Sequence, residues 1–185
     1  MHTIGRFSSA LRCERYLSLV LLFLAPVAGL QAKAQTHGAP ALGQASVANV
    51  KNFDKVANAA LLGMRQRAAE LNISGVAVVA YFEGDSIQSW SSKMLVVGRM
   101  KDNPSATDKG ANLLAIAYSK AAEMADTLKD SGSKVRPSMT GEVGWTGGVI
   151  LRGKAGYVIA AFSGGKSEED VKVSQAGVEV LKSKL

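Results

Sequence analysis

Residues 147–170 read GGVILRGKAGYVIAAFSGGKSEED and hold two apolar runs followed by the start of a helix. The first run covers residues 147–151 and the second covers residues 157–162, with small and polar residues between them. Two short apolar runs joined by a glycine-containing turn predict a β-hairpin. Ser167 and the acidic side chains after it are typical of a helix N-terminus. We therefore expect a hairpin and then a final helix, capped by Ser167 and running to about Lys182.

The segments upstream of this hairpin show helical and strand patterns in turn. Apolar residues recur every three or four positions over residues 47–71, which predicts an amphipathic helix. Residues 76–82 predict a buried strand, and residues 86–97 predict either one long bent strand or two short ones. Residues 110–128 carry a second helical pattern. Hairpins joined by helices indicate an α+β fold, with an antiparallel sheet of about five strands flanked by about three to four helices.

The N-terminal 34 residues have the pattern of a secretory signal peptide. Three arginines precede a mostly apolar run over residues 16–30, and Ala32 and Ala34 occupy the two positions that a signal peptidase reads. The alternative is a membrane anchor, but this run is short for the ~20 residues that a spanning helix needs. We expect cleavage after Ala34 and a mature protein that is periplasmic or secreted, with no membrane contact.

The expected organisation of the chain is therefore a signal peptide at residues 1–34, a flexible leader at residues 35–46 and one domain at residues 47–185. Cleavage removes four of the 22 basic and one of the 15 acidic side chains, so the net charge falls from +7 to +4. That mild charge gives no reason to expect a nucleic-acid partner. The leader is rich in alanine, glycine, glutamine and proline, which is typical of a linker.

Cleavage also limits the chemistry of the mature chain. Cys13 and His2 leave with the signal peptide, so no thiol remains and His37 becomes the only histidine. This composition excludes a cysteine nucleophile and a histidine- or thiolate-rich zinc site. No nucleotide motif or acid–base pair is evident, so the sequence neither indicates nor excludes an enzymatic activity.

Several short segments of the domain carry a resemblance to a known family. They are Val76-Ala77-Val78-Val79-Ala80, Arg99-Met100, Lys120-Ala121, Gly147-Gly148-Val149-Ile150, and Phe162-Ser163-Gly164-Gly165 followed by Glu169-Asp170. In this order they resemble the GlcG/HbpS-like family of haem-binding and haem-degrading domains. The resemblance covers about residues 53–181, and residues 147–180 are its most specific part.

The resemblance implies a fold, an assembly and a function. Its fold is an antiparallel sheet flanked by helices, assembled as a homo-oligomer, often an octamer. Its function is that of an exported haem-binding protein in haem uptake or degradation. Two alternatives stay open: a module that binds a small carboxylate, and an oligomeric structural or stress-related protein without catalysis. The chain departs from the family pattern at Tyr81-Phe82 and at Lys101-Asp102-Asn103, where a ligand site would be shaped.

Residues at strand ends, in glycine-rich turns and on the second predicted helix are candidates for binding a small anionic ligand. They are Arg99, Lys120, Gly147, Gly148, Ser163, Gly164 and Gly165. Residues 163–165 lead into a helix N-terminus, where free N–H groups and the helix dipole suit a carboxylate or phosphate. Glycines at these positions would let a ligand approach the backbone closely. The alternative for this segment is a tight turn between a strand and a helix.

The charged and paired-glycine candidates each have a structural alternative. Lys120 could meet a carboxylate, or it could lie on a solvated helix face with its stem on apolar neighbours. Arg99 could fork onto a carboxylate, or it could end a strand at the sheet edge. Gly147 and Gly148 could offer backbone donors to a planar ligand, or they could form a loop entering a strand.

A haem group would need an axial ligand, which is usually histidine, methionine, cysteine or tyrosine. His37 is the only imidazole of the mature chain, and its place in the leader also fits a solvated histidine. Tyr118, Met100 and Met124 are the other candidates, although such residues more often belong to a core or a surface.

Overall fold

A computed structural model describes residues 47–184, with side chains from Phe53 onward. The expected signal peptide, the leader and His37 lie outside the described residues. In chain order the elements are α1 (Val47–Glu70), β1 (Gly75–Glu83), β2 (Ser91–Val97), β3 (Lys101–Asp102), β4 (Ala111–Asn112), α2 (Leu113–Thr127), β5 (Gly148–Arg152), β6 (Gly156–Ser163) and α3 (Ser167–Lys182). Within the described range, no helix is long and apolar enough to span a bilayer.

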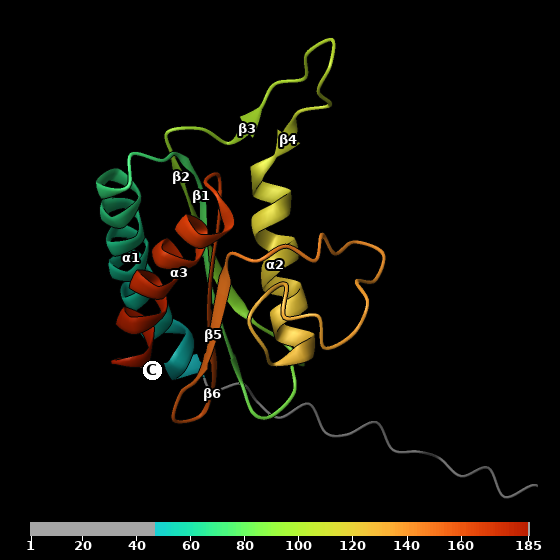
Figure 1. Ribbon diagram of the computed structural model, residues 1–185. Helices are drawn as coiled ribbons and strands as arrows, with labels where there is room; N and C mark the ends of the chain where they lie inside the picture. Colours follow the sequence, from blue (N-terminus) through green and yellow to red (C-terminus); the bar gives the residue numbers. More distant parts are fainter. Residues whose placement is uncertain (1–46, 185) are drawn as a thin grey trace, which may run out of the picture. The chain divides into compact units, whose positions relative to one another are not determined.

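Four strands form one antiparallel sheet in the order β2-β1-β6-β5 (Figure 1). In the centre of the sheet, Ala80 of β1 lies opposite Ser92 of β2 on one side and opposite Ile159 of β6 on the other. β5 and β6 form the predicted hairpin, in which Ile150 pairs with Ile159. The expectation of an α+β fold built on an antiparallel sheet is confirmed.

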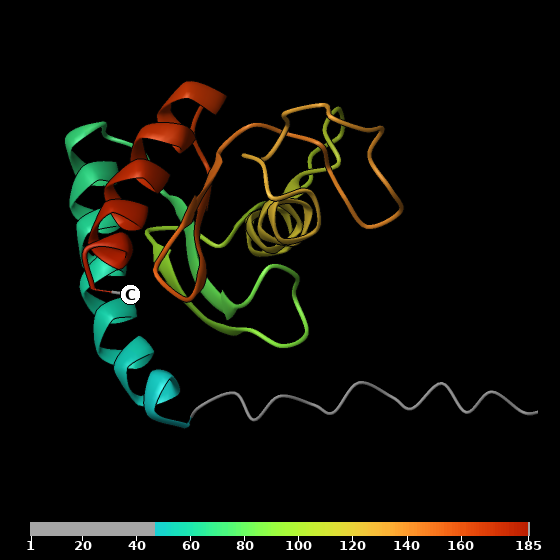
Figure 2. The same cartoon turned by 90° about the horizontal axis from the view of Figure 1, so that it is seen from below.

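Helices cover both faces of this sheet, with α1 and α3 on one face and α2 on the other (Figure 2). The central strand β1 is consequently buried on both sides, and its sequence is a continuous apolar run instead of an alternating one. Successive side chains of a strand point to opposite faces. Val79 therefore joins the cluster under α1 and α3, and Val78 joins the cluster under α2.

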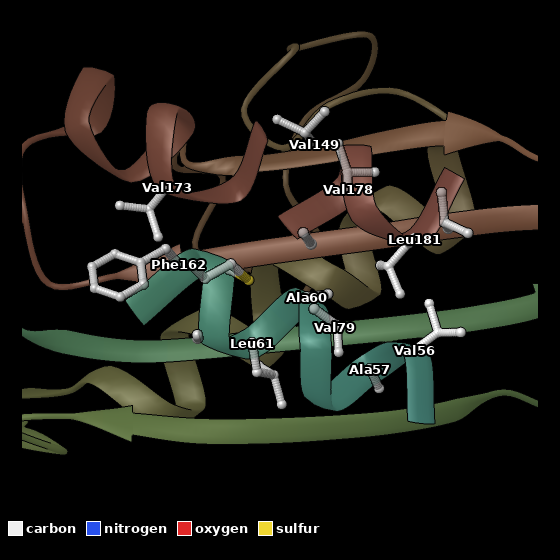
Figure 3. Packing of buried hydrophobic residues seen from close by; sticks show 14 of the residues in the cluster. Val56, Ala57, Ala60, Leu61, Val79, Val149, Phe162, Val173, Val178 and Leu181 are labelled. Carbon is white, nitrogen blue, oxygen red and sulfur yellow. The ribbon is translucent and has the colours of Figure 1, made fainter. Parts of the chain in front are cut away.

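The packing under α1 and α3 depends on small residues that let the layers approach closely (Figure 3). Ala57 and Ala60 of α1 are fully buried there, as is Ala160 of β6. Gly177 of α3 has no room for a side chain, because an added Cβ would lie 2.5 Å from the sulfur of Met64. The two helices and the sheet therefore fit together without space for one more methyl group at this point.

Two details of the architecture differ from the sequence-based expectation. The sheet has four strands instead of about five, and the two-residue strands β3 and β4 form a separate ribbon beside the start of α2. β1 ends at Glu83, and the next strand of the sheet begins only at Ser91. Residues 91–97 therefore make a single strand, and the segment between Glu83 and Ser91 is not in the sheet. The described range holds three helices.

Ser167 is the first helical residue of α3, so its expected role as the N-cap was wrong. The N-cap position is Lys166, whose backbone is extended. The N–H of Lys166 donates to Oε2 of Glu169 at 2.9 Å, and the N–H of Gly165 donates to Oδ1 of Asp170 at 2.8 Å. Carboxylates of the first turn thus accept hydrogen bonds from backbone N–H groups at the start of this helix. The sequence had predicted a serine hydroxyl as the acceptor there.

Candidate functional site

A cavity of about 210 Å³ lies where the end of β6, the start of α3 and the first half of α2 meet. The β3–β4 ribbon and the loop before β5 complete its walls. The lining residues are Asp102, Ala111, Leu113, Ile116, Lys120, Trp145, Thr146, Ser163, Gly164, Gly165, Ser167 and Asp170. Trp145 is still 56% exposed, so it marks the opening of the cavity to solvent.

Lys120 and Asp170 form a buried ion pair in the wall of this cavity. The Lys120 Nζ lies 2.8 Å from Oδ2 of Asp170, and the two side chains are only 2% and 5% exposed. Nζ also donates to the carbonyl oxygen of Phe162 at 2.8 Å. An ammonium has three donors, and these two acceptors account for two of them.

The sequence of each helix explains why these two charges are buried. The face of α2 toward the sheet carries small and apolar residues, and Lys120 lies among Ala117, Ala121 and Met124 on it. The buried face of α3 begins at Asp170 and continues through Val173. The two ionisable residues on these buried helix faces pair with each other, because an unpaired buried charge is very costly.

Burial changes the protonation of both members of the pair. It lowers the pKa of the Lys120 ammonium, and the attraction of Asp170 acts in the opposite direction. It raises the pKa of the Asp170 carboxyl, and the attraction of Lys120 opposes that shift. Burial therefore disfavours both charges relative to the same groups in water, and the attraction between the two groups at 2.8 Å opposes this effect.

Gly147 is the backbone neighbour of the ion pair. Its φ of +140° lies in the region that favours glycine, and an added Cβ would clash with the Lys120 Nζ and lie 2.8 Å from the Asp170 Cβ. The Gly147 carbonyl accepts a hydrogen bond of 2.7 Å from the Ser174 hydroxyl. Gly148 follows in β5, where an added Cβ would clash with Met124 and where its N–H donates to the Ser131 hydroxyl at 2.8 Å.

Arg99 supports the turn at the end of β6 from the side of β2. Its guanidinium donates to the Gly164 carbonyl at 2.9 Å, to the Ser74 carbonyl at 2.6 Å and to Asp102 at 2.6 Å. These bonds hold the turn of Gly164, which itself adopts a φ of +154° and lies against the Ser74 backbone. The Arg99 side chain is thus engaged with protein acceptors and does not line the cavity.

The loop that carries Trp145 and Thr146 is attached to α2 by a second ion-pair cluster. Arg136 donates to both oxygens of Glu142 at 2.7 Å and to Asp126 of α2. The hydrogen bonds from Arg136 are the largest cause that lowers the pKa of the Glu142 carboxyl to about 2. Ser119 of α2 adds a hydrogen bond from the Val143 N–H at 2.9 Å. The loop that closes one side of the cavity is therefore fixed to α2 near Trp145.

The structure brings together most of the sequence-predicted binding residues. Lys120, Ser163, Gly164 and Gly165 line one cavity, and Gly147 lies against its ion pair. Gly148 and Arg99 do not line the cavity; they contact Met124 and the Gly164 turn, as described above. Of the haem-ligand candidates, Met124 is fully buried in the core, Tyr118 packs near Trp90 with ring centroids 6.5 Å apart, and Met100 is 43% exposed.

Asp170 lines the cavity but was not among the sequence-predicted binding residues. The sequence placed it in a segment that carries the family resemblance and among the acidic residues that start a helix. A signal was present: Asp170 falls three and four positions before Val173 and Ser174 on the buried face of α3. An acidic residue on a buried helix face predicts a cationic partner. Trp145 and Thr146 also line the cavity, and the sequence had suggested no lining role for their side chains.

Comparisons with family models, with curated proteins and with solved structures find no match to the chain. The chemistry of the cavity is therefore judged from its own walls. The lining combines the apolar residues Leu113, Ile116 and Trp145 with the Lys120–Asp170 pair and with three hydroxyl-bearing residues, Thr146, Ser163 and Ser167. A pocket of this kind suits a small molecule that has both apolar and polar groups.

Proposed function

We propose that the cavity binds a small organic acid through Lys120. The observation that carries this proposal is a buried ammonium in the cavity wall that has one donor beyond its two protein acceptors. The start of α3, which is the positive end of a helix dipole, borders the same cavity at Ser167. The apolar part of a short acid would then lie on Leu113 and Ile116.

Two carboxylates that line the cavity are each paired with a cation of the protein. Asp170 is paired with Lys120, and Asp102 accepts from Arg99 at 2.6 Å. The Glu169 carboxylate accepts from the Lys166 N–H. The volume of about 210 Å³ is below the ~300–1,000 Å³ typical of pockets for drug-sized ligands. This size favours an acid of a few carbon atoms.

The proposal is tested by titrating the protein with lactate, propionate and acetate and following backbone amide shifts by NMR. The amides of Thr146, Gly164 and Gly165 should move with a common saturable curve. Ala111→Phe fills the cavity from β4 and should abolish these shifts, whereas Ala155→Phe, in the exposed turn between β5 and β6, should leave them unchanged. Unmoved amides, or undiminished binding in Ala111→Phe, would contradict the proposal.

A second candidate is haem binding, the function implied by the resemblance to the GlcG/HbpS-like family. Two exposed residues support it: Trp145 lines the cavity, and the Met100 carbonyl oxygen accepts a hydrogen bond from the N–H of the lining residue Leu113. A haem group is too large for the cavity itself, so it would lie over the opening or between two copies of the chain. Haem titration should then shift the Soret band, and Met100→Leu should reduce the shift. No Soret change at micromolar protein would exclude this candidate.

Export and self-association complete the proposal. N-terminal sequencing of the secreted or periplasmic protein should find Gln35 as the first residue, and an intact Met1 would contradict the signal peptide. Assembly as a homo-oligomer, an octamer in the family implied by the resemblance, is tested by light scattering. A monomer of the mature chain at micromolar concentration would contradict it.

A further inference from the structure

The Lys120–Asp170 pair is an unusual feature to place in the wall of a cavity. A buried ion pair adds little net stability, because desolvation offsets most of the attraction, and apolar residues of similar volume often do as well. The α2 residues that pack with the sheet in the apolar cluster around Lys120 are Leu113, Ile116, Ala117, Ala121, Met124 and Ala125. The pair is therefore better explained by what it does in the cavity than by what it adds to the core.

The pair places a lysine amine beside a proton acceptor in the lining of a cavity. A lysine amine attacks carbonyl carbon atoms only when it is unprotonated; burial favours that form, and a neighbouring carboxylate, although it stabilises the ammonium, can accept the proton that the amine releases. The Asp170 carboxylate lies 2.8 Å from Nζ and shares the burial. Burial also lowers the pKa of Lys120 and raises that of Asp170.

We infer that Lys120 forms a Schiff base with a small 2-oxo acid, with Asp170 as the carrier of the proton. This inference rests on the proposed small-acid site and names its substrate class. In a 2-oxo acid the carbonyl carbon is bonded directly to the carboxylate, so an acid bound beside Nζ brings that carbon next to the nitrogen. Ser163 and Ser167 also line the cavity, and their hydroxyl groups are the donors that we assign to the carboxylate.

The reaction balances with groups that the cavity contains. Lys120 transfers a proton to Asp170, and the freed lone pair attacks the carbonyl carbon, so that a C–N bond forms and the C=O π electrons move to oxygen. That oxygen takes the proton from Asp170. Asp170 then removes a proton from nitrogen and returns it to the hydroxyl group, which leaves as water. The products are a protonated imine on Lys120, one water molecule and the Asp170 carboxylate.

The experiment is reductive trapping with pyruvate and sodium cyanoborohydride, read by intact mass and by peptide mapping. Wild-type protein should gain one reduced pyruvate adduct, located on Lys120 and formed at least tenfold faster than on any exposed lysine. Lys154→Arg, in the turn before β6, should label as wild type does. Lys120→Arg should lose the adduct, and circular dichroism shows whether that variant is folded. Asp170→Asn should slow trapping and change its pH profile.

The outcomes separate this inference from the proposed function. Lactate has no ketone carbonyl, so it should bind without forming an adduct and should protect Lys120 from pyruvate. If lactate and pyruvate both shift the cavity amides but Lys120 is never labelled, the Schiff base is refuted and the acid site stands. If neither acid shifts the amides, the proposed function is refuted. Labelling spread evenly over exposed lysines also refutes the inference, whatever the folding state of the variants.

Discussion

Replacing Lys120 with methionine removes one charge of the buried ion pair while keeping a long side chain in place. Asp170 would retain the Gly165 N–H as its hydrogen-bond donor, at 2.8 Å, and its carboxylate would stay buried. Removal of one partner from a buried pair costs about 3–5 kcal/mol. This is a large share of the about 5–15 kcal/mol by which a domain is stable. Lys120→Met should therefore unfold at a clearly lower urea concentration.

The assay is urea unfolding at pH 7, followed by circular dichroism, on a set of four proteins. The double variant Lys120→Met with Asp170→Leu removes both charges and should recover most of the stability lost in the single variant. Arg67→Met breaks a surface pair with Glu70, in which both side chains are well exposed. That control should change stability little, because solvent screens an exposed pair.

The pH dependence of Lys120→Met gives an independent check. Burial raises the pKa of Asp170 in the folded protein, and without Lys120 only the hydrogen bond from the Gly165 N–H opposes that shift. In the unfolded chain the same carboxyl titrates near ~3.9. The variant should therefore regain stability as pH falls through the raised folded-state pKa, and the gain should end once both states are protonated below ~3.9.

Two results would refute this reasoning. A loss below about 1 kcal/mol at pH 7 would mean that Asp170 is not buried as a charge. A double variant that is as unstable as the single one would mean that Lys120 acts through its packing, not through its charge.

Three further perturbations test the same structure. Gly147→Ala puts a methyl group against the buried ion pair at a positive φ, so it should cost about 1–3 kcal/mol in urea unfolding, and wild-type stability would contradict the described backbone. Gly177→Ala should lower the free energy of unfolding by about 1 kcal/mol in the same assay, because the clash with Met64 costs more than the gain in helix propensity returns. A more stable variant would show that the helices can move apart. Glu142 has a pKa of about 2, so its attachment to Arg136 is complete above its ordinary pKa and is lost as pH falls through about 2. NMR titration of its carboxyl carbon should show this midpoint, and Arg136→Gln should raise it; an ordinary midpoint in wild type would mean that the loop is not attached.

Most of the secondary structure could be predicted because it follows from local patterns. The spacing of apolar residues identified α1 and α2, and the paired runs identified the β5–β6 hairpin. The number of strands in the sheet could not be predicted in this way. Apolar and polar residues alternate around Trp90 in the segment after Glu83, which is a strand pattern. A strand also needs a neighbouring strand to pair with, and β1 pairs with the following segment only from Ser91 onward.

The candidate site was predictable in part for the same reason. Gly164, Gly165 and Lys120 stand out in the sequence, since paired glycines and a lysine on an apolar face are local features. The role of Arg99 was not readable, because its acceptors Ser74 and Gly164 come from two distant turns.

Sequence alone was enough to predict an α+β domain with a glycine turn before its last helix and a lysine among the alanines of its middle helix, because these properties belong to stretches of a few residues. The ion pair of Lys120 with Asp170 joins residues 50 positions apart. It exists because α2 and α3 lie on opposite faces of the sheet and both reach the end of β6, where Phe162 and Gly165 supply the remaining hydrogen bonds. The cavity and its chemistry are properties of that packing.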